Sequence, residues 1–161
     1  MNSKDLIKNL NLLPHPEGGY YKETYRSEVL TTIIDGKTRN TCTAIYYLLE
    51  GDDKSNFHRL QSDEMWFFHQ GNTIEILTIQ NNCIETYLLG NDISNGEISQ
   101  LLIPANIWFA AKIKIKSGYS LVSCTVSPGF DFEDFELARR NELSLEFPHL
   151  IEIIEQFTNN Q

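Results

Sequence analysis

The feature that most constrains the fold is the texture of the chain from residue 20 to about residue 126. Short runs rich in β-branched and aromatic residues alternate there with turn-forming pairs such as Asp35-Gly36 and Ser117-Gly118. Many short strands without long helices between them indicate an antiparallel sandwich or barrel rather than a doubly wound sheet. The expected strands cover residues 19–27, 29–34, 41–49, 56–60, 64–70, 73–79, 83–88, 99–103, 107–114 and 119–126.

Both ends of the chain have helical patterns. Ser3 is suited to cap a short helix that must end before Pro14, and its apolar positions are Leu6, Ile7 and Leu10. Pro148 suits the first position of a second helix, whose apolar face is formed by Leu150, Ile151, Ile154 and Phe157. With 161 residues and no linker or repeat, we expect one domain over residues 1–161.

The charge balance limits the partners. Thirteen Lys and Arg residues against twenty-two Asp and Glu residues give a net charge of −9, which disfavours nucleic acids and anionic membranes. The start of the chain lacks an apolar signal core, and no run is long enough to span a membrane, so we expect a cytoplasmic protein. Cys42, Cys83 and Cys124 form no metal or disulfide pattern, and we expect buried thiols in strands.

Two histidines and an acid pair occur among aromatic residues in the segment 57–71. Strand alternation places His58 and Leu60 on one face, and Glu64 and Trp66 together on one face of the next strand. If these faces line the barrel, His58 and Glu64 converge in a cavity, where they are able to bind a metal or to act as an acid–base pair. The alternative, that both are hydrogen-bonded rim groups, stays open.

Two further segments are candidates for the wall of that cavity. The Pro- and Gly-rich loop that begins at His15 leads into a strand, and together they carry Glu17, Tyr21 and Glu23 as polar ligand-binding candidates. Alternation allows only Tyr21, Glu23 and Tyr25, or else the intervening set, to face the cavity. The stretch 102–111 supplies Trp108 and Phe109 as an apolar wall. The acids and phenylalanines of 126–136 read as a solvated turn that docks on the barrel.

In their order along the chain, these segments resemble one family. Residues 14–27, 58–60, 63–66, 104–111, 118–122 and 128–135 are similar to the cupin superfamily, specifically its DUF985 (cupin-5) branch. The resemblance implies a double-stranded β-helix, which is a jelly-roll barrel, with short N- and C-terminal helices. It also implies assembly as a homodimer.

The resemblance to cupins also implies where a divalent metal would bind. The first His of the general cupin motif falls at His58 and its Glu at Glu64. The second His of that motif is Leu60 here, and the late His is Phe109, so two of four implied ligands are apolar.

A second, shorter similarity points to an activity. Gly19, Tyr21, Glu23 and Tyr25 at alternate positions resemble the early strand of metal-free deoxysugar-nucleotide 3,5-epimerases. That resemblance implies a small sugar or sugar-nucleotide-like ligand and His58 as the catalytic base. A metal-dependent enzyme using His58 and Glu64, and a binding module without catalysis, remain the alternatives.

Overall fold

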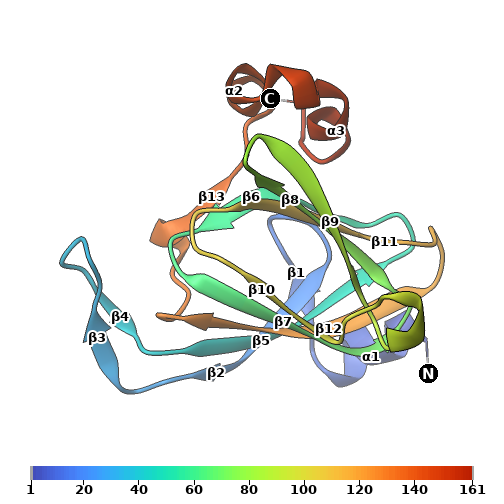
Figure 1. Ribbon diagram of the computed structural model, residues 1–161. Coiled ribbons are helices and arrows are strands. Elements are labelled where there is room, and N and C mark those ends of the chain that lie inside the picture. Colours follow the sequence, from blue (N-terminus) through green and yellow to red (C-terminus); the bar gives the residue numbers. More distant parts are fainter. Residues whose placement is uncertain (1, 161) are drawn as a thin grey trace.

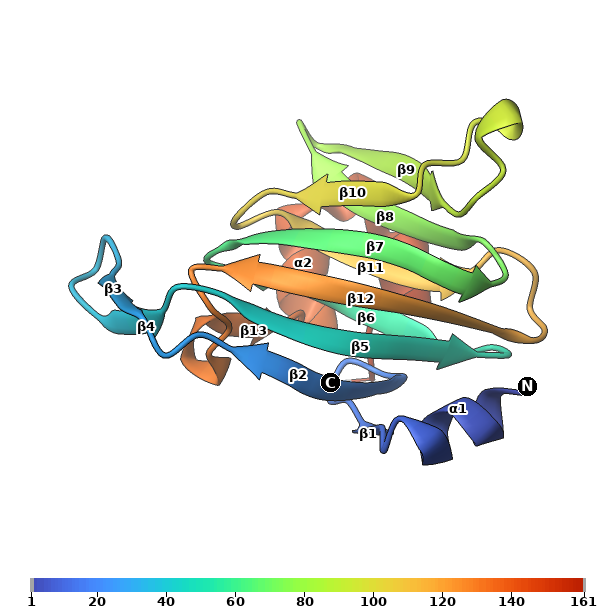
Figure 2. The ribbon, with the colours of Figure 1, turned by 90° about the horizontal axis from the view of Figure 1, so that it is seen from below.

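The strands form two antiparallel sheets that face each other (Figures 1 and 2). The structure is a computed structural model and describes residues 2–160. The six-stranded sheet has the order β1 (Leu13–Pro14), β2 (Tyr20–Arg26), β5 (Thr43–Glu50), β12 (Tyr119–Ser127), β7 (Asp63–Gly71) and β10 (Gln100–Ile103). The five-stranded sheet has the order β13 (Phe135–Leu137), β6 (Lys54–Leu60), β11 (Trp108–Ile113), β8 (Ile74–Gln80) and β9 (Cys83–Leu89). The all-β prediction is confirmed.

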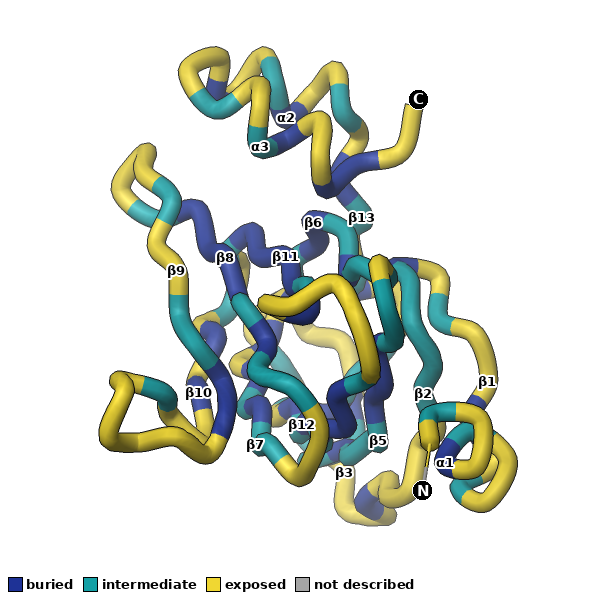
Figure 3. The backbone as a smooth tube through the Cα atoms, turned by 90° about the vertical axis from the view of Figure 1, so that its right-hand side faces the viewer, coloured by how far each residue is buried: buried dark blue, intermediate teal, exposed yellow. Residues whose placement is uncertain are grey.

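The space between the sheets holds the main core. Alternation along the strands sends Tyr47, Trp66, Phe109 and Val122 into this interior, where they are buried. In Figure 3 the backbone is dark blue, and so buried, over much of the two sheets. The middle of β9, which forms an edge of its sheet, is mostly exposed. Cys124 is buried as expected, but Cys42 is half-buried and Cys83 is exposed on that edge strand, so the prediction of three buried thiols is wrong.

Helices cover the outer faces of both sheets. α1 (Ser3–Asn9) places Leu6 against Leu48 and Leu121 of the six-stranded sheet. Its cap is Asn2 rather than the expected Ser3, because the Asn2 side chain accepts the amide of Asp5.

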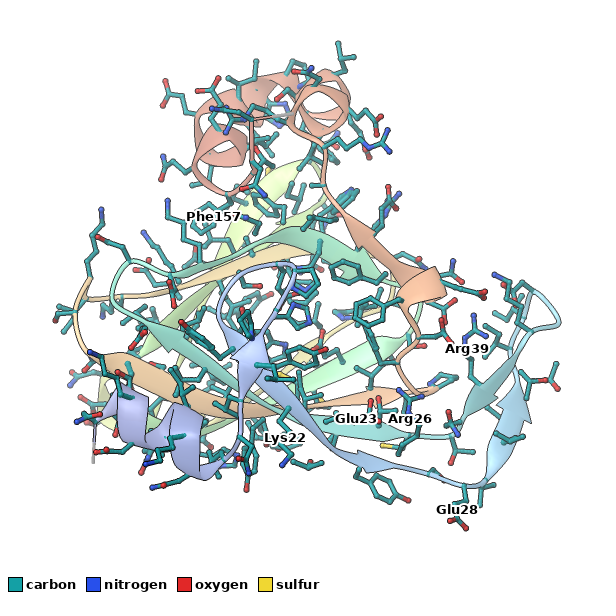
Figure 4. The ribbon with its side chains drawn as sticks, turned by 180° about the vertical axis from the view of Figure 1, so that it is seen from behind. Lys22, Glu23, Arg26, Glu28, Arg39 and Phe157 are labelled. Atoms are coloured by element: carbon teal, nitrogen blue, oxygen red, sulfur yellow. The ribbon has the colours of Figure 1, made fainter. Side chains whose placement is uncertain are left out.

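The outer face of the five-stranded sheet lies under α2 (Arg140–Glu146) and α3 (Ile151–Gln156), as Figure 1 shows. Phe157 lies between these helices and the barrel (Figure 4) and packs against Phe57. The expected apolar face is only partly buried, since Ile154 and Phe157 are buried whereas Ile151 is exposed. α2 was not expected from the sequence.

A hairpin of β3 (Leu30–Thr32) and β4 (Thr38–Asn40) projects from the barrel (Figures 1 and 2). Arg39 is buried at its base, where Nε and Nη2 donate to the Asp134 carboxylate at 2.7 and 2.9 Å. The expectation of a wholly solvated acidic turn over 126–136 is therefore wrong for Asp134.

In the described part of the chain, residues 2–160, no helix has the length and apolar character needed to cross a membrane.

Candidate functional site

A cavity of about 520 Å³ opens into the barrel interior. Its lining comes from the segment 13–17, from β2, β5, β6, β7 and β12, and from the segment 130–135. Most of its wall is apolar, with a few polar groups that converge within it, as is usual for a small-molecule site.

A tight turn delivers the first polar groups to the cavity. The His15 amide donates to the Gly19 carbonyl at 2.9 Å, and the Gly18 amide donates to the His15 carbonyl at 3.0 Å. Gly18 has a φ of +111°, and a Cβ there would overlap the carbonyl oxygen of Lys54. Only glycine therefore allows the loop to pack this closely against β6.

This turn places Glu17 inside the barrel against His58. The Asn56 amide donates to the Glu17 carbonyl at 2.8 Å and fixes the loop to β6. The Glu17 carboxylate then lies 2.9 Å from Nε2 of His58, and the two residues are only 6% and 2% exposed. Two candidates that are 41 positions apart in the chain thus form one buried pair.

Both nitrogens of His58 act as donors. Nδ1 lies 2.7 Å from the Asn56 carbonyl oxygen, which only accepts, and Nε2 faces the Glu17 carboxylate. Burial alone would lower the pKa of His58, but the charge and hydrogen bond of Glu17 outweigh it and raise that pKa. Burial likewise opposes ionisation of Glu17, yet His58 holds the pKa of Glu17 below its ordinary value. These shifts favour a carboxylate beside an imidazolium, and both nitrogens of His58 are engaged, one with the Asn56 carbonyl and one with Glu17.

Glu64 has no such partner. It lines the same cavity from β7 and is 7% exposed, and its Oε2 is buried without a hydrogen bond within the described residues. Burial raises the pKa of the Glu64 carboxyl from 4.5 to about 7. His58 and hydrogen bonding with the side chains of Trp66 and Cys124 oppose the shift, and the charge of Glu17 adds to it. Near neutral pH this carboxyl is therefore able either to accept or to donate a proton.

The residues present do not fit a divalent metal. No group of three or more His, Cys, Asp or Glu side chains in residues 2–160 is arranged to hold one. Both nitrogens of His58 are engaged within the protein, Nδ1 with the Asn56 carbonyl and Nε2 with the Glu17 carboxylate, so neither is directed at a metal position in the cavity. Leu60 lines the cavity, and Phe109 packs beneath it on the His58 ring with centroids 4.1 Å apart, so the two implied ligand positions hold apolar side chains that contact the site and bind no metal.

Two predicted wall residues of β2 face the cavity together with two that alternation excluded. Tyr21 and Glu23 line it as expected, and so do Lys22 and Arg26, whereas Tyr25 is exposed outside it. The register of β2 against β5 shifts between Glu23 and Tyr25, and this bulge turns Arg26 onto the face of Glu23. Figure 4 shows Glu23 and Arg26 side by side, and the Arg26 guanidinium donates from Nε and Nη2 to the Glu23 carboxylate at 2.9 and 2.8 Å.

The three aromatic candidates separate. Trp66 and Phe109 are buried in the barrel core beneath the cavity and touch each other, with ring centroids 6.1 Å apart. Trp108 belongs to the outer core, packed towards α2 and α3, and the Arg59 guanidinium lies over its ring. Contrary to expectation, none of the three is part of the cavity lining. Trp108 points away from Phe109 because neighbouring residues of a strand point to opposite faces.

Sequence reasoning missed part of the lining. Cys124 of β12 faces the cavity, where burial raises the pKa of its thiol and keeps it neutral. Phe130, Phe132 and Phe135 form an edge-to-face aromatic cluster with centroids 4.9 to 6.1 Å apart, and all three reach the cavity. Their repeated spacing in the sequence was the available signal.

Comparisons with known proteins agree on one family. The family model described as Cupin superfamily (DUF985) matches residues 4–138. A structure of protein SO0799 from Shewanella oneidensis is 38% identical, with a TM-score of 0.91 and coverage of 100% of this chain and 99% of that one. A hypothetical protein from Leishmania major is 34% identical, with a TM-score of 0.92 and coverage of 99% and 100%. Uncharacterized protein YML079W from Saccharomyces cerevisiae is 32% identical over 92% of this chain and 79% of its own.

Proposed function

We propose that this chain, which belongs to the DUF985 family of the cupin superfamily and has its jelly-roll barrel, is an isomerase or epimerase. It binds a small polar molecule such as a sugar in the barrel cavity and moves a proton on it. Glu64 is the group that takes and returns the proton.

One observation carries this proposal: the buried carboxyl of Glu64 in the cavity wall, whose Oε2 has no hydrogen bond within the described residues. A buried acceptor without a hydrogen bond costs about 1–3 kcal/mol, which folding alone gives no reason to retain. A carboxyl with a pKa of about 7 is matched to proton transfer at neutral pH. The group therefore has the position and the acidity of a general base.

His58 has a different role in this proposal from the one expected of it. Its imidazolium is locked between Glu17 and the Asn56 carbonyl, and its charge favours the ionised form of Glu64. His58 is thus a positioning residue that keeps part of the Glu64 population ionised at neutral pH.

The test is the exchange of substrate C–H hydrogen for solvent deuterium. Ligands are first found by thermal shift with a panel of sugars, since a bound ligand stabilises the folded state. Those ligands are then incubated in D₂O and followed by NMR. Glu64→Gln keeps the shape of the side chain, and we expect it to retain binding and lose about 10²–10⁴-fold in exchange rate.

Glu28→Gln is the matched control, since Glu28 is exposed and lies away from the cavity (Figure 4). It removes the same charge and should leave exchange unchanged. Binding without exchange in the unmodified protein would reject catalysis and leave a binding module.

We also propose that the protein forms a homodimer through the side of β2 that faces away from β5. β1 pairs only with Tyr20 and Tyr21, so residues 22–26 have no strand partner on that side within residues 2–160. Tyr25, Val29 and Leu30 are exposed nearby. Sedimentation equilibrium should give twice the chain mass, and Leu30→Asp should shift the protein towards the monomer. A monomer at micromolar concentration would contradict this proposal.

A further inference from the structure

His15 is held rigidly at the cavity wall. Its Nδ1 accepts the Glu17 amide at 3.2 Å, and its ring meets those of Tyr21 and Tyr47 edge-on, with centroids 4.5 and 5.9 Å away. The Phe135 ring lies on another side at 6.2 Å. With 6% of the side chain exposed, the ring has one orientation.

The hydrogen bond to Nδ1 determines where the proton of His15 lies. A ring nitrogen that accepts a hydrogen bond carries no hydrogen, so the neutral ring carries it on Nε2. Burial lowers the pKa of His15 and outweighs the carboxylate of Glu17, which keeps the ring neutral. Nε2 has no partner among residues 2–160 although the ring lines the cavity, which leaves one N–H donor for a ligand.

The charges around the cavity disfavour a strongly anionic ligand. The Arg26 guanidinium donates all five of its N–H hydrogens within the protein, to the Glu23 carboxylate, the Asn40 side chain and the Phe130 carbonyl. Lys22 is then the cation of the described lining without a carboxylate partner. Four carboxyl groups share that lining, and two of them, Glu17 and Glu23, are paired with His58 and Arg26. A pyrophosphate would meet one free cation and the remaining acids, Glu64 and Asp131.

We infer that His15 donates a hydrogen bond from Nε2 to the carbonyl oxygen of the substrate, and that the substrate is a free aldose or ketose rather than a nucleoside diphosphate sugar. This inference rests on the proposed role of Glu64. The Glu64 carboxylate removes the proton from the carbon beside the carbonyl, and that C–H electron pair becomes the C=C bond of an enediol. The carbonyl π pair moves onto oxygen, where the His15 N–H stabilises the developing charge.

The same carboxyl then completes the reaction. Glu64 returns its proton to the former carbonyl carbon. The hydroxyl proton on the carbon that lost its C–H hydrogen moves to the former carbonyl oxygen, so that aldose and ketose interconvert without a co-reactant. The phenylalanine cluster offers an apolar surface to the C–H face of the sugar.

The experiment measures deuterium exchange for free aldoses and ketoses of three to six carbons and for a nucleoside diphosphate 4-keto sugar. His15→Leu removes the donor, and we expect a loss of about 10²–10³-fold in turnover with KM changed less than tenfold. His15→Gln places an amide N–H near the position of Nε2 and should recover part of the rate, while His15→Asn is too short and should not. His69→Leu is the matched control, because His69 is exposed on β7 and contacts Ser123 outside the cavity.

The outcomes separate the two proposals. If Glu64→Gln abolishes deuterium exchange and His15→Leu leaves it intact, the role of His15 is overturned while the proposed function stands. Exchange with the nucleotide sugar and not with free sugars would overturn the substrate class. Absence of exchange with every compound would overturn the proposed function itself. If His15→Leu does not fold, the comparison of His15→Gln with His15→Asn decides.

Discussion

Glu64→Gln should make the protein more stable, and increasingly so as the pH rises. The carboxyl has a pKa of 4.5 in an ordinary setting and of about 7 in the fold. Between these values the folded protein keeps a proton that the unfolded chain has released. The free energy of unfolding therefore falls as the pH rises through this window and levels off above it.

The size of this effect follows from the two pKa values. At about 1.4 kcal/mol per pH unit, the ionisation of Glu64 costs the folded state about 3 kcal/mol by pH 8. Glutamine has nearly the same shape and no charge. The difference in unfolding free energy between Glu64→Gln and the unmodified protein should thus grow from near zero at pH 4.5 to about 3 kcal/mol at pH 8.

Urea unfolding followed by tryptophan fluorescence at pH 4.5, 6, 7 and 8 measures this difference directly. Groups that titrate alike in both proteins cancel. Glu28→Gln should show no such slope, since Glu28 is exposed. A Glu64→Gln difference that does not change with pH would refute the assignment of a raised pKa and, with it, the reasoning about the general base.

Three further predictions concern the Glu17–His58 pair, the glycine turn that positions it, and the absence of a metal requirement. Glu17→Gln should destabilise the fold by about 3 kcal/mol between pH 5 and 6, because it breaks a buried ion pair. The loss of unfolding free energy caused by Glu17→Gln should become smaller below pH 4.5, where Glu17 gains a proton. It should also become smaller above the raised pKa of His58, where the imidazolium is lost. A loss that is equal at every pH in urea unfolding would contradict this. Gly18→Ala should lower the free energy of unfolding by about 2–3 kcal/mol, because the backbone is strained and the new Cβ overlaps Lys54. Gly36 also has a positive φ but lies in open space, so Gly36→Ala should lower it by only about 1 kcal/mol. Equal losses would count against the loop geometry. Dialysis against a chelator should leave the melting temperature and the exchange activity unchanged, and a loss restored by one divalent metal would show that the donor set has been misjudged.

Local patterns were enough to predict most of the strands and part of the site, while the short strands β1, β4 and β13 were missed. Period-two alternation brought His58, Leu60 and Glu64 to one cavity, as the structure has them. The same rule separates Trp108 from Phe109, which the sequence analysis had placed on one wall. That error came from treating an aromatic stretch as a unit and not from any special geometry.

Other features depend on contacts that no local pattern encodes. The pairing of Glu17 with His58 requires the 15–19 turn to fold into the barrel, and it engages the Nε2 of His58 that the sequence left free to act as a base. The bulge in β2 adds Arg26 to the wall, and a one-residue shift of this kind leaves no clear mark in the sequence. Asp134 looked like a solvated acid because its partner, Arg39, is 95 positions away. Tertiary structure decided each of these cases.

NMR titration of the side-chain carboxyl carbon of Glu64 determines whether this carboxyl is half-ionised at neutral pH. Glu64→Gln assigns the resonance by its disappearance from the spectrum. We expect a midpoint near pH 7. A midpoint near 4.5, the value of an ordinary glutamate, would contradict it.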